Sequence, residues 1–138
     1  MTEFVEEMGI LIQEVVGTRV GDFFLPALAG VAYSKNEFRW SSRIRREDGL
    51  VRLVPGLGTR AVDRVGDDYP TLLVPGKPNL HVNVIIEEKV RYSAHKVDAL
   101  NLETNRFETL DIQRLLRDGE GEFPLLDRVF SVRSGQML

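Results

Sequence analysis

The sequence contains no cysteine, and this absence excludes several chemistries at once. Disulfide bonds, catalysis by a thiolate and zinc sites with cysteine ligands all require that side chain. Histidine is scarce too: only His81 and His95 occur, and neither has a metal-type spacing or a recognisable catalytic partner. Because a serine hydrolase also needs an orienting acid and an oxyanion site, we do not expect hydrolase chemistry.

Long hydrophobic runs are also missing. The longest nearly unbroken apolar stretch, Phe23–Tyr33, contains Pro26 and Gly30 and spans 11 residues, whereas a membrane helix needs roughly 20 apolar residues. The first seven residues carry three glutamates, whereas a secretory signal begins with positive charge. We therefore expect a cytoplasmic protein with no membrane partner.

The composition is that of one globular domain. The chain has 138 residues, of which 43% are hydrophobic, and a formal net charge of -3. Such a chain can bury a core, and it is neither a disordered tail nor a polybasic nucleic-acid arm. Phe38 and Trp40 are the aromatic residues near its basic segment, too few for a base-stacking platform. We expect no nucleic-acid partner.

Positive charge is concentrated in residues 39–64, which contain seven arginines and three acidic residues. The planar fork of arginine suits bidentate binding of phosphate or carboxylate. One interpretation is a site for a polyanion; the other is a solvated arginine-rich loop paired with acidic neighbours. The polar loop from Lys35 to about Asp48 is long, and loops of more than about 12 residues in compact domains are often binding elements.

Hydrophobic patterning predicts a mixed α+β fold with a mainly antiparallel sheet and short helices, in one domain over residues 1–138. The predicted strands are Gly9–Val16, Ala29–Ser34, Gly49–Val54, Thr71–Val74, His81–Ile86, Lys96–Leu102 and Arg106–Leu110, the last two forming a hairpin. A short helix is predicted over Thr59–Asp63, a second after the capping residue Asp111, and a third over about residues 124–130.

The turn at residues 56–59 (GLGT) precedes the first predicted helix. Its glycines allow backbone amides to approach an anion at the helix start. The turn is not a phosphate-binding P-loop, because no Gly-Lys-Ser/Thr follows, and it lacks the third glycine of the dinucleotide fingerprint. Asp63, Asp67 and Asp68 lie nearby; they offer oxygen ligands for Mg2+ or are simply polar helix-end residues.

Four segments in order carry a resemblance to a known family: ILIQEVVG at 10–17, AGVAYSKN at 29–36, the strand at 49–54 and the glycine turn at 56–58. Over about residues 8–75 they resemble the ATP-binding region of pyruvate phosphate dikinases and phosphoenolpyruvate synthases. The remainder resembles only less characterised members, through NLETNRFET. The resemblance implies a partial ATP-grasp domain, with a nucleotide-binding core at 8–75 and a hairpin plus two C-terminal helices at 76–138.

The resemblance implies ATP as the ligand. Backbone groups around Glu14 and Val15 would lie along the adenine, and the glycine turn would follow the metal-binding strand. The residues that we assign to nucleotide binding are Gln13, Glu14, Val15, Arg43, Arg52, Gly56, Gly58 and Arg60. We assign no catalytic residue.

The resemblance also implies Mg2+, but this sequence departs from the family where the metal would bind. Family members have an acidic residue on the strand before the turn and a glutamate just after it; here Val51, Arg52 and Thr59 occupy those places. A positive side chain there would repel Mg2+. Asp67 and Asp68 are therefore the remaining candidate metal ligands.

Further domains of the family have no counterpart in this sequence: an earlier phosphate-gripping lobe, a swivelling domain with a phosphorylated histidine and a pyruvate-binding barrel. We therefore expect part of the ATP-binding domain of a larger phosphotransferase, inactive alone and partnered by the remaining domains. The alternative is a non-catalytic regulatory or interaction module on the same scaffold, which the missing acidic ligands favour. An exposed lobe surface would also allow a homodimer.

Overall fold

The computed structural model describes residues 8–62, 68–83, 85–118, 132–133 and 136–137. Its strands are β1 (Thr18–Val20), β2 (Phe23–Leu25), β3 (Leu28–Tyr33), β4 (Leu50–Pro55), β5 (Thr71–Leu73), β6 (Lys96–Asn101), β7 (Arg106–Asp111), β8 (Val132–Arg133) and β9 (Gln136–Met137). Its helices are η1 (Arg46–Asp48), α1 (Thr59–Val62), α2 (Ile86–Arg91) and α3 (Ile112–Asp118). This confirms the mixed α+β fold with antiparallel sheets and short helices.

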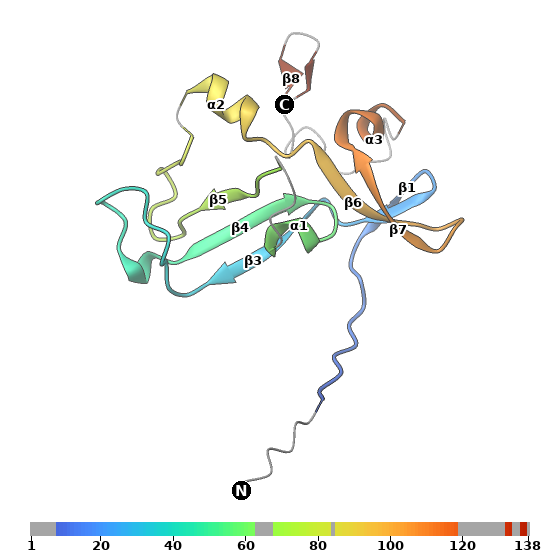
Figure 1. Ribbon diagram of the computed structural model, residues 1–138, viewed down its shortest axis with the longest axis horizontal. Helices are drawn as coiled ribbons and strands as arrows, with labels where there is room; N and C mark the ends of the chain where they lie inside the picture. The colour runs from blue at the N-terminus through green and yellow to red at the C-terminus, as the bar shows by residue number, and fades with distance from the viewer. Residues whose placement is uncertain (1–7, 63–67, 84, 119–131, 134–135, 138) are drawn as a thin grey trace, which may run out of the picture.

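Two main sheets lie next to each other along the molecule (Figure 1). One has the strand order β1-β2-β6-β7 and the other β3-β4-β5, with β8-β9 as a separate pair. The chain passes from the first sheet to the second through Pro26 and Ala27, between β2 and β3. In the four-stranded sheet, β1 and β2 come from the predicted core at 8–75, and β6 and β7 come from the segment at 76–138.

A cluster of buried hydrophobic side chains lies between the four-stranded sheet and α3. Val97 and Ala99 are fully buried on one face of β6, since alternate residues of a strand point to the same side. The cluster is completed by Val20, Leu25, Leu110, Ile112 and Leu115. Asp98, between the two core residues, must then point to the opposite face of β6.

The hairpin and the helix cap follow the sequence prediction. β6 and β7 pair from Lys96 with Asp111 to Asn101 with Arg106. Asn105 adopts a positive φ of 53° in the turn, a conformation that asparagine tolerates. The Asp111 side chain accepts hydrogen bonds from two backbone N–H groups at the start of α3, those of Gln113 (2.8 Å) and Arg114 (3.3 Å).

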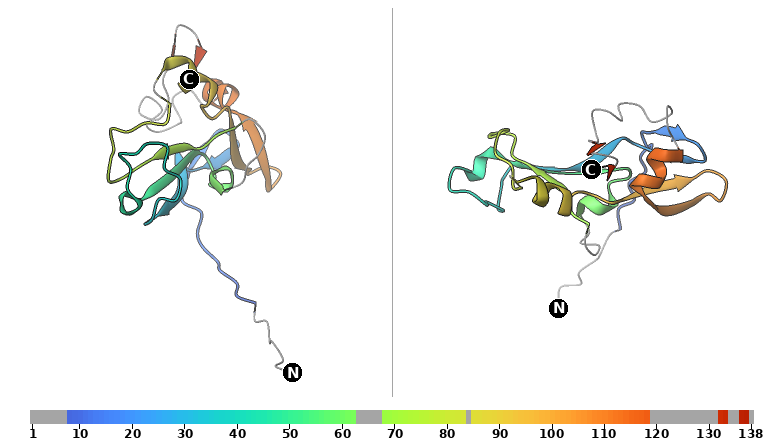
Figure 2. Two further views of the ribbon diagram at one scale, coloured as in Figure 1. Left: turned by 60° about the vertical axis from the view of Figure 1, so that its left-hand side comes forward. Right: turned by 90° about the horizontal axis from the view of Figure 1, so that it is seen from above.

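The predicted strand Gly9–Val16 is wrong. Residues 8–17 form no strand, and Ile10, Leu11 and Ile12 are 84%, 80% and 89% exposed. A strand needs a neighbour to accept and donate its backbone hydrogen bonds, and no described residue pairs with this segment. In Figures 1 and 2 it extends away from both sheets.

The structure also differs from the sequence prediction in two other places, residues 18–25 and residues 81–86. The sequence prediction missed the hairpin of β1 and β2, whose turn contains Gly21 with a φ of 57°. The predicted strand His81–Ile86 is also wrong, because α2 begins at Ile86. Glutamates at the start of α2 and basic residues at its end suit the helix dipole. The helix predicted over about 124–130 lies outside the described residues.

The arginine-rich loop at 35–49 is held in shape by Asn36, which is completely buried. The Asn36 side-chain amide donates to the Gly49 carbonyl (3.0 Å), and its oxygen accepts from the Phe38 N–H (2.9 Å). The Asn36 backbone N–H donates to the Arg46 carbonyl (2.7 Å). One buried side chain thus closes the loop across its two ends.

We predict that Asn36→Ala lowers the free energy of unfolding by about 2 to 4 kcal/mol, because two backbone groups lose their buried partners. Urea denaturation followed by circular dichroism measures this change. Asn79→Ala is the matched control, since Asn79 is exposed, and we expect a change below about 0.5 kcal/mol. Equal free energies of unfolding for the two variants would contradict the role of Asn36 in holding the loop.

Candidate functional site

The glycine turn after β4 docks against the edge of β6. β2 pairs with Leu100 and Asn101 of β6. At Asp98, two residues earlier, β2 does not cover the same edge of β6. There Gly56 forms a parallel bridge with Asp98, and the Leu57 N–H donates to the Asp98 carbonyl (2.9 Å). This contact joins the two main sheets.

Gly56 is required by this contact. Its φ is 72°, a left-handed conformation that favours glycine. A Cβ at this position would collide with the Val97 side chain and the Asp98 backbone. The conformation and close packing of Gly56 against β6 explain this glycine without a ligand.

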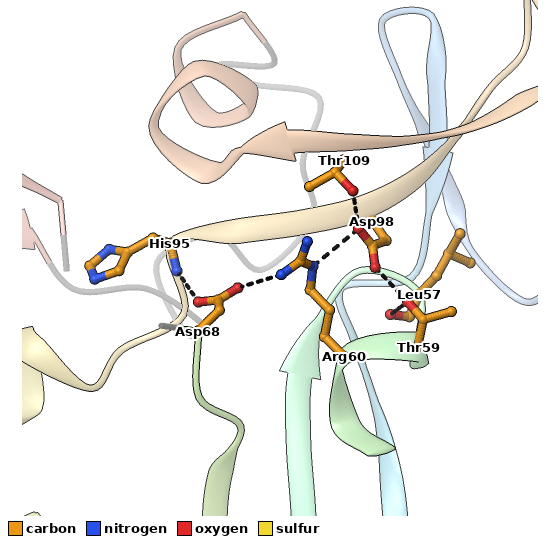
Figure 3. Close-up of polar contacts among 7 residues, drawn as sticks. All are labelled: Leu57, Thr59, Arg60, Asp68, His95, Asp98 and Thr109. Atoms are coloured by element: carbon orange, nitrogen blue, oxygen red, sulfur yellow. Dashed lines mark hydrogen bonds and ion pairs between the residues drawn. The ribbon is translucent and has the colours of Figure 1, made fainter. Parts of the chain in front are cut away.

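Arg60, on α1, lies between two carboxylates in a nearly closed site (Figure 3). Its Nε is 3.1 Å from Asp98 Oδ1, and its Nη1 is 3.2 Å from Asp68 Oδ2. The side chains of Arg60, Asp68 and Asp98 are 9%, 10% and 15% exposed. Burying a charge is costly unless it is paired, and here one cation is shared by two anions.

The remaining carboxylate positions are filled by other donors, as Figure 3 shows. Thr59 and Thr109 donate their hydroxyls to Asp98 Oδ2 (2.5 Å) and Oδ1 (2.7 Å). The His95 backbone N–H donates to Asp68 Oδ1 (2.7 Å). Every carboxylate oxygen of this cluster therefore has a protein donor.

These donors set the protonation of Asp98. Burial alone raises the pKa of its carboxyl, but hydrogen bonds from Thr59, Thr109 and Arg60, together with the Arg60 charge, outweigh burial. The net pKa of Asp98 is lower than its ordinary value. Asp98 therefore stays ionised in the folded protein and keeps its ion pair with Arg60.

Asp68 does not fit the role of a Mg2+ ligand in this arrangement. Mg2+ needs carboxylate oxygens free of competing cations, whereas Asp68 is bound by the Arg60 guanidinium and the His95 N–H. Among the described residues no group of three potential metal ligands comes together. Asp67, the other predicted ligand, lies outside the described residues, so metal binding there stays a prediction.

Arg52 occupies a different place, in the middle of the three-stranded sheet. It pairs with Val31 of β3 and Leu72 of β5. Its guanidinium carbon lies 5.8 Å from the centre of the Tyr33 ring. The Arg52 Nε is buried and has no hydrogen-bond partner within the described parts of the chain.

The predicted nucleotide-binding residues are not gathered in one place. Arg43 is exposed in the loop before Leu50, whereas Arg60 follows Pro55 at the other end of β4. Six strand residues span roughly 17 Å, so these two arginines cannot hold the same phosphate group. A Cβ at Gly58 would lie 3.4 Å from the Ala29 side chain. Residues 13–15 lie in the extended segment outside both sheets.

The sequence also matches a family model. The family described as pyruvate phosphate dikinase, AMP/ATP-binding domain, matches residues 1–120. The chain belongs to this AMP/ATP-binding domain family. Comparison with curated proteins and with solved structures gave no match.

The match covers the whole of the Arg60 cluster and all seven strands of the two main sheets. In the described residues no helix is long and apolar enough to span a bilayer.

Sequence reasoning missed Asp98, Thr109 and the His95 backbone N–H as parts of this cluster. Asp98 lies 38 residues after Arg60, and no local motif links them. The signal available in the sequence was an acidic residue between buried Val97 and Ala99 on a strand, which places a charge opposite the core face. A carboxylate there needs a partner, and Arg60 supplies it.

We predict that Arg60→Met lowers the free energy of unfolding by about 3 to 5 kcal/mol, because Asp68 and Asp98 are left buried without a cation. Urea denaturation at neutral pH measures the change. Arg19→Met is the control, since Arg19 and Asp22 are 3.9 Å apart with 67% and 56% exposed side chains; we expect less than about 1 kcal/mol. A small effect at Arg60 would show that the cluster does not stabilise the fold.

We predict a specific loss of stability in acid. The lowered pKa of Asp98 means that its contribution is complete above the ordinary value of about 3.9 and is lost as pH falls through the folded pKa. Asp98→Asn removes the titrating group. Between about pH 5 and about pH 3 the parent should lose more free energy of unfolding than this variant. Equal losses of the free energy of unfolding in the two proteins would show that ionised Asp98 does not stabilise the fold.

Proposed function

We propose that this chain forms part of the nucleotide-binding region of a phosphoenolpyruvate synthase or pyruvate phosphate dikinase-like phosphotransferase, on an ATP-grasp scaffold. The match of residues 1–120 to an AMP/ATP-binding domain family supports the nucleotide. In such a domain, catalysis rests mainly on positioning and on neutralising the phosphoryl charge. We propose that this chain contributes binding groups and is inactive without the other domains of the enzyme.

The observation that carries the proposal is the free hydrogen-bonding capacity of Arg52. A buried guanidinium nitrogen without a partner costs free energy unless something else binds it, and the Arg52 Nε is in that state among the described residues. The residue paired with Arg52 on β3 is Val31, in the AGVAYSKN segment of the family resemblance. A phosphate oxygen bound by Arg52 would satisfy both the charge and the nitrogen.

The adenine contact is assigned to the backbone of residues 13–15. These residues form no strand, and among the described residues no hydrogen bond of their N–H and C=O groups is found, which leaves them able to bind an adenine edge. Glu14 and Val15 are the central pair. We propose that closure on the nucleotide orders this segment alongside the sheet of β3, β4 and β5.

Arg60, Gly56 and Gly58 have structural roles in this proposal. Arg60 is engaged by both carboxylates, so it positions the turn and does not contact phosphate. No step of the proposal passes through Mg2+, since Asp68 is engaged by Arg60. Metal bound elsewhere in the enzyme is compatible with these assignments.

A second candidate function is a non-catalytic interaction module. The observation that favours it is the exposed apolar segment Ile10–Ile12, since contiguous exposed apolar residues mark interaction sites. Replacement of the expected acidic ligands by Val51, Arg52 and Thr59 favours it as well. In this case the fold would persist with no nucleotide affinity, and partner binding would survive chelation of metal.

Calorimetric titration with a non-hydrolysable ATP analogue tests the nucleotide proposal. Arg52→Gln should weaken binding about tenfold or more, in a salt-dependent way, because one charge-assisted contact is lost. Arg106→Gln is the control with the same charge change, since Arg106 is exposed on β7. Unchanged affinity of Arg52→Gln relative to the control would overturn the proposal, and no binding at millimolar analogue would favour the interaction module.

A further inference from the structure

A second concentration of positive charge lies apart from Arg52 and Arg60, in an open pocket of about 570 Å3. The arginine-rich loop forms one wall and the turn at 76–80 forms the other. No lining residue belongs to β3, β4 or β5. Its volume is in the range typical of small-molecule sites.

Three cations line this pocket: Arg43 and Arg45 from the loop and Lys77 from the turn. Arg46 in the same loop forms an ion pair with Glu37. In the described part of the chain, no ion pair is found for Arg43, Arg45 or Lys77. Asp48 adjoins the pocket beside Gly76, and one of its oxygens already accepts the Arg45 backbone N–H (2.7 Å). The pocket therefore keeps an excess of positive charge.

The two walls are held in position by the fold. Buried Asn36 closes the loop, and the side chain of Ile44, between the two arginines, is buried. The Gly76 N–H donates to the Asp48 carbonyl (2.9 Å), which fastens the turn to the loop. Three like charges are thus brought together by backbone contacts that do not depend on their own side chains.

Like charges held near one another repel, and a multivalent anion between them relieves that repulsion. Two guanidinium groups offer planar forks and the ammonium offers a point charge, a combination suited to phosphate oxygens. A pocket of this size holds more than one phosphate group. An acidic peptide is less suited, since its carboxylates are spaced along a chain, whereas three cations around one pocket suit several anionic oxygens on one group.

We propose that this pocket binds an oligophosphate group, free or as part of a small molecule, at a site separate from the nucleotide contacts around Arg52. Arg43, assigned to nucleotide binding from the sequence, then belongs to this second site together with Arg45 and Lys77. The inference stands on the pocket and its charges and does not rest on the proposed nucleotide function.

Titration of the 15N-labelled chain with pyrophosphate at constant ionic strength tests the proposal. Backbone signals of residues 42–45 and 76–80 should shift together with one stoichiometry. The triple variant Arg43→Gln, Arg45→Gln, Lys77→Gln should bind at least about 30-fold more weakly, because three charge-assisted contacts are lost. All three residues are exposed, so the fold should persist, and circular dichroism checks this.

The matched control is the triple variant Lys89→Gln, Lys96→Gln, Arg106→Gln, which removes the same charge from exposed positions elsewhere. It should retain the parent affinity. Equal weakening in both triples, or shifts at the two walls no larger than those over the rest of the surface, would overturn the proposal as non-specific attraction. Stronger competition by a glutamate-rich peptide than by tripolyphosphate would overturn it in favour of a protein-binding surface.

Failure of this site is distinguishable from failure of the nucleotide proposal. Pyrophosphate affinity should be unchanged in Arg52→Gln. An ATP analogue that shifts only the pocket residues would support this site and contradict the Arg52 contact.

Discussion

The arrangement of the molecule depends on one buried cation, Arg60, shared by two carboxylates. Asp98 comes from the four-stranded sheet, whereas Asp68 lies just before β5 of the three-stranded sheet. The hydrophobic cluster around Val97 belongs to the four-stranded sheet and α3, and the Arg60 ion pairs and the Gly56 bridge join the second sheet to the first. Each ion is costly to bury without its partner, so we expect the ion pairs of the junction to form and break together.

The fold gives the arginines that stand out in the sequence four different roles. Arg60 is paired with Asp68 and Asp98 at the junction between the sheets. Arg46 is paired with Glu37. Arg52 keeps an unpartnered buried nitrogen on the sheet, whereas Arg43 faces a separate pocket. Family membership gives the ligand class of the domain, but a side chain already paired within the protein has no free charge for a ligand.

The sequence predicted those features that local chemistry determines. The β6-β7 hairpin and the Asp111 cap depend on residues within a few positions of each other, and both are present. The segment at 9–16 has strand composition, but a strand forms only with a neighbour. The Arg60–Asp98 pair joins positions 38 residues apart, which no spacing rule could supply. For the same reason, the packing of Gly56 against Val97 and Asp98 of β6 could not be predicted from the sequence of the turn.

Native-state hydrogen exchange tests most directly whether Arg60 couples the two sheets. In the parent protein the amides of β4 and of β6, including the Leu57 N–H that donates to Asp98, should exchange through one shared opening reaction. In Arg60→Met the β4 amides and that of Leu57 should lose more protection than those of β6 and β7. Protection that falls equally in both sheets, or in neither, would contradict the account.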